Sequence, residues 1–172
     1  MNKQVALLGI IEIISSLTLG IFILIITYRL VKVYGIKKLQ IDHSNTAYNI
    51  LIAAVLFAVG YIVSGVVEPI VDAFRLLAKT DISSVSLTLK FLAFGGLYIA
   101  IAYTLSIVIS LLSVYTYTRI TPLDELTEIK NNNISVGILI ASIIIILSLF
   151  TKSGIVILVE SLVPYPDLPP SI

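Results

Sequence analysis

Four long apolar segments, separated by short polar stretches, make up most of this chain. They cover residues 5–28, 46–70, 87–117 and 134–160. A helix rises about 1.5 Å per residue, so about 20 apolar residues cross the ~30 Å hydrocarbon core of a bilayer. Every segment exceeds that length, and the pattern therefore predicts four membrane-spanning helices.

A polar loop that ends in asparagine precedes the second and the fourth segment. The first loop and segment read LQIDHSNTAYNILIAA over residues 39–54, and the second read TEIKNNNISVGILIAS over residues 127–142. Asn45 and Asn133 hold equivalent positions in these two stretches. We interpret the chain as two tandem helical hairpins, a parallel internal repeat whose pseudo-two-fold axis runs along the membrane normal. Each asparagine is predicted to be the N-cap of the helix that follows it.

These features predict an all-α fold, an integral membrane four-helix bundle, with residues 1–172 as a single membrane domain. Between the second and third segments, PIVDAFRLLAK at residues 69–79 has an apolar face and a charged face. This spacing is typical of a helix that lies in the membrane interface. Residues 164–172 are rich in proline, which favours an extended tail.

The distribution of basic residues predicts the orientation in the cell membrane. The loop after the first span is basic, whereas Lys3 alone precedes that span, so the loop is placed in the cytoplasm and both termini outside. We expect the first span to be retained, because no small-residue cleavage site follows it. Five tyrosines are predicted to form an aromatic belt at the cytoplasmic interface: Tyr28, Tyr34, Tyr48, Tyr115 and Tyr117.

Composition narrows the chemistry further. Hydrophobic residues make up 58% and charged residues 12%, against about 25% charged in soluble domains. A net charge of +1 offers no basic patch for nucleic acid. Without cysteine, and with one histidine and one methionine, the chain cannot supply thiolate ligands or the usual haem pairs by itself. We expect no cofactor and no metal. Low Cys, Met and Gln with no Trp suits a thermophile's protein.

Glu12 is an ionisable residue inside the first span. Such a residue costs on the order of 2.5–3.5 kcal/mol at the centre of a membrane helix, and it therefore calls for a partner. Lys152 and Glu68 have comparable depths in their own spans. We regard Glu12 and Lys152, with Glu68 nearby, as a candidate intramembrane charge pair. The open alternatives are ion or proton handling, a structural pair, and an interfacial carboxyl.

Other patterns have structural explanations. Small residues at four-residue spacing let helices approach closely, and packing within one bundle is favoured over a dedicated oligomer face. The acidic run Asp124, Glu125 and Glu128 is predicted to be a solvated loop face. No catalytic constellation is present, so the chain is not expected to be an enzyme. The small-residue pairs are Ser16 and Gly20, Ala54 and Ala58, Gly60 and Ser64, Gly96 and Ala100, and Gly137 and Ala141.

The stretch YTRITPLDELTEIKNNNIS at residues 117–135, polar and followed by a span, resembles the YjfL-like family of small membrane proteins, domain of unknown function 350. The Ile-Thr-Pro, the acidic pair and the terminal asparagine carry the resemblance. It implies a four-helix integral membrane protein of two hairpins and no settled activity. Where the family usually has small residues or glycine after the asparagine, this chain has Ile134, Ser135 and Val136.

Two functions are compatible with these patterns. The first is a non-enzymatic accessory or structural subunit of a larger membrane protein complex. A respiratory complex is one such setting, in which this chain would carry no electrons itself. The alternative is a small channel or transporter for an ion or small solute, with Glu12 and Lys152 in the path. The expected partners are membrane lipids and either other membrane subunits or further copies of the chain, and not nucleic acid.

Overall fold

The computed structural model describes residues 3–42, 44–77, 84–121 and 124–162, whose regular structure is all helical. Two helices are short: α3 (Val67–Leu77) and α5 (Glu125–Lys130). Four are long: α1 (Lys3–Lys37), α2 (Thr46–Ser64), α4 (Ser84–Ile120) and α6 (Ile134–Leu162).

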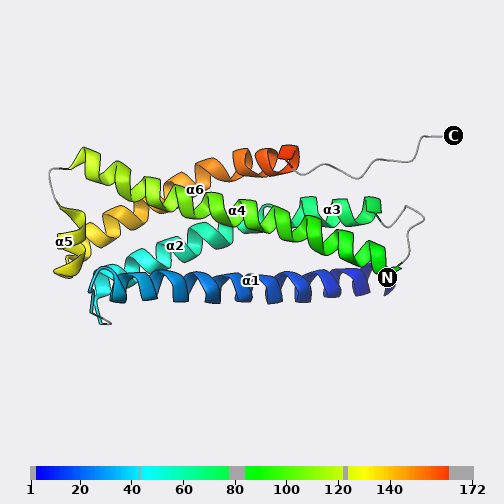
Figure 1. The fold of residues 1–172 in the computed structure, drawn as a ribbon, viewed down its shortest axis with the longest axis horizontal. Helices are drawn as coiled ribbons and strands as arrows, with labels where there is room; N and C mark the ends of the chain where they lie inside the picture. The colour runs from blue at the N-terminus through cyan, green and yellow to red at the C-terminus, as the bar shows by residue number, and fades with distance from the viewer. Residues whose placement is uncertain (1–2, 43, 78–83, 122–123, 163–172) are drawn as a thin grey trace.

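Four stretches of these helices are long and apolar enough to cross a membrane, and they form a bundle along one long axis (Figure 1). The prediction of an all-α protein with four such helices is confirmed, and this is the architecture of a multi-pass membrane protein. The four candidate spans are Ser16–Lys37, Thr46–Ala73, Thr88–Ile120 and Ile134–Ser161.

The helix α2 lies at the centre of the bundle, where it packs against α1, α4 and α6. In the most apolar part of the second candidate span, 44% of the residues are buried. In the same part of the first candidate span, only 17% are buried. The first helix is therefore peripheral, and its long apolar surface faces outward. Core residues of α2 include Ile52, Ala54, Ala58, Val59 and Ile62.

The first turns of α2 and α6 approach each other closely. A Cβ atom at Gly137 would lie 2.9 Å from the carbonyl oxygen of Ala47 and 3.1 Å from its Cα. Further along the pair, Ala54, Ala58 and Ala141 are buried. Small residues let two helix backbones come this close, which is how membrane helices gain packing energy.

Helix boundaries differ from the predicted ones where local interactions extend or break a helix. α1 continues past residue 28 to Lys37, and Lys32 donates a hydrogen bond to the Tyr28 hydroxyl one turn earlier, at 2.6 Å. α2 ends at Ser64, before the predicted residue 70. Pro69 explains this break, since its ring would collide with the carbonyl of Gly65 in a continuous helix.

α3 runs along the long axis of the bundle beside α4 (Figure 1). The interfacial location of residues 69–79 stays a prediction. Of the predicted interfacial helix at residues 69–79, residues 78 and 79 lie outside the described part. The proline-rich tail at residues 164–172 lies outside it as well.

The acidic run before the last span is helical and partly buried. Asp124 is the N-cap of α5, and its side chain accepts a hydrogen bond from the backbone N–H of Thr127. Glu125 is only 5% exposed and accepts a hydrogen bond from the Thr121 hydroxyl at 3.0 Å. The predicted solvated loop face is therefore wrong for Glu125, because this hydroxyl supplies a partner that helical spacing alone does not reveal.

Candidate functional site

The loops that precede α2 and α6 lie together at one end of the bundle (Figure 1). Asn45 is the N-cap of α2, and its side-chain oxygen accepts a hydrogen bond from the N–H of Tyr48 at 2.7 Å. Its side-chain nitrogen donates to the carbonyls of Ile129 at 2.6 Å and Lys130 at 3.2 Å. One residue thus caps α2 and binds the last carbonyls of α5.

Asn132 completes this connection from the other loop. Its side-chain oxygen accepts a hydrogen bond from the backbone N–H of Ala47 at 3.0 Å. The first turn of α2 is therefore capped by one asparagine from each loop. We call Asn45 and Asn132 the asparagine clamp. Asn132 was not predicted from the sequence. Its φ of 60° is a conformation that asparagine tolerates better than most residues.

Asn133 has a more local role than its counterpart. Its oxygen lies 3.4 Å from the N–H of Val136 in the first turn of α6, and its nitrogen donates to the Glu128 carboxylate at 2.6 Å. Both predicted cap residues thus lie at helix starts. Only Asn45 uses its side-chain nitrogen to reach the other loop.

The second polar assembly surrounds Lys152, toward the other end of α6. The ammonium group donates to the Ser64 hydroxyl at 3.3 Å and lies 4.2 Å from the centre of the Tyr61 ring. The Ser64 hydroxyl donates in turn to the carbonyl of Tyr61 at 2.7 Å. A cation here is stabilised by the ring and by the negative end of the α2 dipole.

Gly65 makes room for this lysine at the break between α2 and α3. A Cβ atom there would lie 2.8 Å from Cε of Lys152 and 2.8 Å from Cγ2 of Val156. The absence of a side chain lets the lysine stem cross the break and reach Ser64. The break therefore has two sequence determinants, Pro69 on its far side and Gly65 within it.

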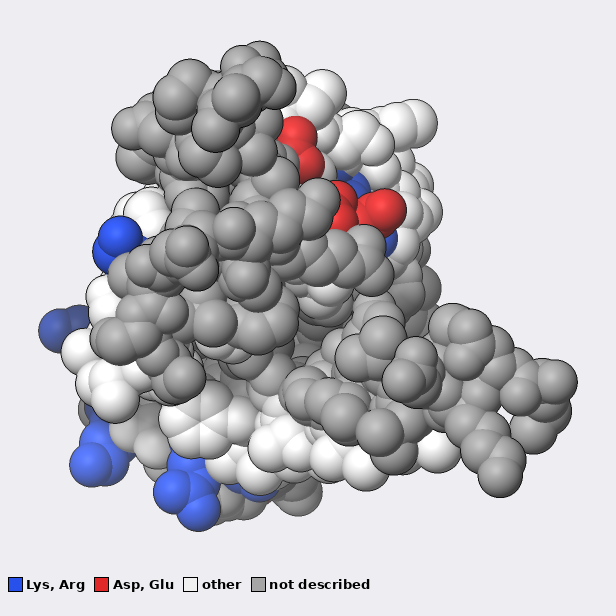
Figure 2. All heavy atoms as spheres, turned by 90° about the vertical axis from the view of Figure 1, so that its right-hand side faces the viewer, with Lys and Arg blue, Asp and Glu red and all other residues white. Residues whose placement is uncertain are grey.

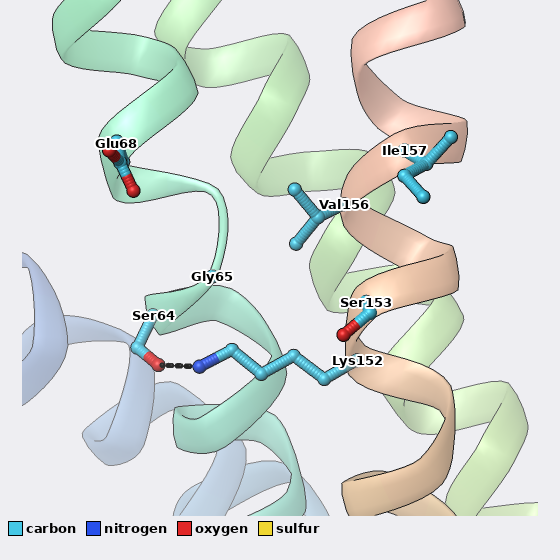
Figure 3. A pocket seen from close by; sticks show the side chains of 7 residues that line it. All are labelled: Ser64, Gly65, Glu68, Lys152, Ser153, Val156 and Ile157. Atoms are coloured by element: carbon cyan, nitrogen blue, oxygen red, sulfur yellow. Dashed lines mark hydrogen bonds between the residues drawn. The ribbon is translucent and has the colours of Figure 1, made fainter.

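An open recess of about 390 Å³ lies around this lysine (Figure 3). Lys152 reaches from α6 to Ser64, and Glu68 lies on the other side of the turn, in the first turn of α3. Glu68 is exposed, and its carboxylate forms no ion pair with Lys152 in the described part of the chain. We call this site the lysine recess, and it is lined by Ser64, Gly65, Glu68, Lys152, Ser153, Val156 and Ile157.

The depth of the lysine recess follows from helix geometry. From Ile134 to Lys152, α6 rises about 27 Å, and α2 rises about 27 Å from Thr46 to Ser64. The hydrocarbon core of a bilayer is about 30 Å thick. If the end of the bundle with the asparagine clamp lies at one membrane surface, the lysine recess lies near the opposite surface and not in the middle of the membrane.

The predicted partnership of Glu12 with Lys152 stays a prediction. Glu12 belongs to α1, but its side chain is outside the part of the chain that the structure describes. α1 packs against α2, which separates it from α6 along much of the bundle (Figure 1). Lys152 contacts α2 through Ser64 and Tyr61 instead.

Viewed from the end of the bundle that includes α3, acidic side chains lie together at one place, with basic atoms partly visible beside them (Figure 2). Among the residues described, no group of three or more His, Cys, Asp or Glu side chains could hold a metal ion.

Comparison with known families adds to this geometry. Residues 82–163 match the family model Domain of Unknown Function (DUF350). The match confirms the resemblance recognised in residues 117–135. It spans α4, α5 and α6, slightly less than half of the chain, and includes Lys152 but neither Asn45 nor Glu68. No curated protein and no solved structure matches the sequence.

Proposed function

We propose that this chain is a non-enzymatic membrane protein that acts by helix packing, as an accessory subunit of a larger membrane assembly. The observation that carries the proposal is the exposure of α1. Its contacts with the rest of the bundle are mainly with α2, and large apolar side chains along it are exposed. They include Ile13, Leu17, Ile21, Phe22 and Ile25.

Gly20 gives this surface a feature that lipid does not require. A Cβ atom there would meet no atom within 4 Å, and Ser16 lies one turn earlier. Such a small-residue pair leaves a shallow notch into which another helix can pack closely. A partner helix seated on α1 would bury apolar side chains and exploit that notch.

The experiment measures the mass of the assembly extracted in a mild detergent. We expect the full chain to elute in a complex larger than one chain, and Gly20→Leu to release the chain from it. Gly154→Leu is the matched control, because a Cβ atom at Gly154 also meets no atom within 4 Å, but on α6. A wild-type protein that is monomeric and has no partner would contradict the proposal.

The tandem repeat is part of the same proposal. Two parallels between the halves support it: α2 and α6 each follow an asparagine that accepts from an N–H three residues on. Moreover, Tyr28 with Lys32 and Tyr115 with Arg119 form the same hydrogen-bonded pair near the ends of α1 and α4. These basic residues also favour an orientation in which the end with the asparagine clamp is cytoplasmic and both termini are outside. A chain reduced to α4, α5 and α6 should then dimerise, and a stable monomer would contradict the repeat.

A second candidate, a small channel or transporter, is favoured by one observation. The second candidate span, Thr46–Ala73, is interrupted at Gly65, and Lys152 lies at the interruption. Transporters place substrate sites at such discontinuous helices. Flux through liposomes that depends on Lys152 and Glu12 would support this candidate. Equal flux in Lys152→Met, in Glu12→Gln and in the wild type would exclude it.

A further inference from the structure

The lysine recess combines groups of opposite charge that do not neutralise each other directly. Lys152 has three N–H bonds, and its contacts within the described chain are the Ser64 hydroxyl and the Tyr61 ring. At least one donor therefore remains for a ligand. Glu68 is exposed on the other side of the turn and offers a carboxylate.

The recess also joins polar groups to an apolar outer wall. Ser153 is exposed beside Lys152 and supplies a hydroxyl group, whereas Val156 and Ile157 line the next turn of α6. Ile157 is 67% exposed, so this wall opens onto the surface that faces lipid. A water-soluble ligand would gain little from such a wall, but an acyl chain would bury against it.

The position along the helices matches the headgroup region of a bilayer. The recess lies about 27 Å along α6 from its start at Ile134, close to the ~30 Å thickness of the hydrocarbon core. Phosphates of the lipids lie just outside that core. A lysine at this level can bind a phosphate oxygen without leaving the helix surface.

We propose that the lysine recess binds a phospholipid whose headgroup carries both a phosphate and a primary amine, that is, a phosphatidylethanolamine. Lys152 and Ser153 bind the phosphate, and Glu68 accepts a hydrogen bond from the amine. One acyl chain lies along Val156 and Ile157. The break at Gly65 gives the site its shape, because it lets the Lys152 stem cross the turn between α2 and α3.

The test is lipid retention by the purified full chain, measured by native mass spectrometry after equal amounts of phosphatidylethanolamine, phosphatidylcholine and phosphatidylglycerol are added. We expect phosphatidylethanolamine to be retained best. Lys152→Met should lower its retention roughly tenfold, since one charge-assisted hydrogen bond is lost. Lys90→Met is the matched control, because Lys90 is an exposed lysine on α4 that does not line the recess.

Glu68→Met gives an independent readout in a variant whose changed side chain is exposed. It removes the acceptor at this position, so it should keep lipid binding but lose the discrimination between ethanolamine and choline headgroups, because a choline nitrogen has no N–H to donate. Equal retention of the two lipids by the wild type, unchanged retention in Lys152→Met, or unchanged selectivity in Glu68→Met would overturn the proposal. Displacement of the lipid by an equal concentration of soluble phosphoethanolamine would overturn the assignment to a lipid.

Discussion

The side-chain nitrogen of Asn45 donates a hydrogen bond to the backbone carbonyl of Ile129 at 2.6 Å. This bond joins the start of α2 to the end of α5, and the residues are far apart in the sequence. The oxygen of the same side chain caps α2 at Tyr48. A helix cap needs only the oxygen, so the nitrogen adds a connection between the two polar loops.

Replacing Asn45 with alanine should therefore cost more than the loss of a cap. We expect Asn45→Ala to lower the free energy of unfolding by about 2–3 kcal/mol, from the lost cap and the unsatisfied carbonyls together. Denaturant titration in detergent micelles would measure it. Asn49→Ala, at an exposed position one turn later, is the control. Equal effects of the two substitutions would contradict the role of Asn45.

Asn45→Asp separates the two functions of this side chain. Aspartate is as good an N-cap as asparagine, but it cannot donate to the carbonyls of Ile129 and Lys130. We expect this substitution to destabilise the protein by about 1–3 kcal/mol, because a carboxylate would then face the two carbonyls. Hydrogen exchange should show the loss mainly in α5. A variant as stable as the wild type would show that the nitrogen contributes nothing.

The packing of α2 on α6 depends on Gly137. In Gly137→Ala, the new Cβ atom would lie 2.9 Å from the backbone oxygen of Ala47, and a backbone cannot move away as a flexible side chain can. Overpacking of this kind costs about 1–3 kcal/mol. Gly154→Ala has open space instead and should raise the free energy of unfolding by up to about 1 kcal/mol through helix propensity. The melting temperatures should thus change in opposite directions.

The long apolar segments were predictable because membrane-spanning helices need little more than length and hydropathy. The starts of α2 and α6 were predictable for a similar reason, since Asn45 and Asn133 immediately precede apolar runs. The ends of helices were harder to predict. Where a helix ends at the membrane surface, pairs such as Tyr28 with Lys32 continue it beyond the apolar segment.

The direction of a side chain could not be predicted from the sequence, and this was the main limit on predicting the candidate sites. All five predicted belt tyrosines lie near an end of an apolar segment, yet Tyr48 and Tyr117 are buried while Tyr28, Tyr34 and Tyr115 are exposed. The Tyr48 hydroxyl donates to the carbonyl of Val31 at 2.6 Å, across the junction of α1 and α2.

The environment of Lys152 was equally hidden in the sequence. Its contact with Ser64 depends on the relative rotation of α2 and α6, and a hydropathy pattern carries no information about that rotation. Pro69 is a signal of a helix break that the sequence does show, but it does not indicate which side chain of another helix lies at the break.

The pKa of Asp124 offers a test of the α5 cap in solution. A hydrogen bond from the Thr127 hydroxyl, at 2.7 Å, is the main cause that lowers this pKa below its usual 3.8. A carboxyl whose pKa is lowered by folding stabilises the fold above pH 3.8, and its contribution is lost as the pH falls through the lowered pKa. Thr127→Val should raise the pKa toward 3.8, as followed by NMR titration. An unchanged pKa would contradict this cause.

The ring of Tyr61 should hold Lys152 in place independently of the tyrosine hydroxyl. The ammonium group lies 4.2 Å from the ring centre, a distance at which a cation–π contact contributes about 0.5–2 kcal/mol. Tyr61→Leu should therefore destabilise the protein by about 1–2 kcal/mol, which also includes the lost stacking on Phe57. Tyr61→Phe keeps the ring and should stay within about 0.5 kcal/mol of the wild type. If Lys152→Met removes the difference between these two variants in a double-mutant cycle, the contact is the cause. If the difference in stability between Tyr61→Leu and Tyr61→Phe is undiminished in Lys152→Met, stacking on Phe57 alone is its cause.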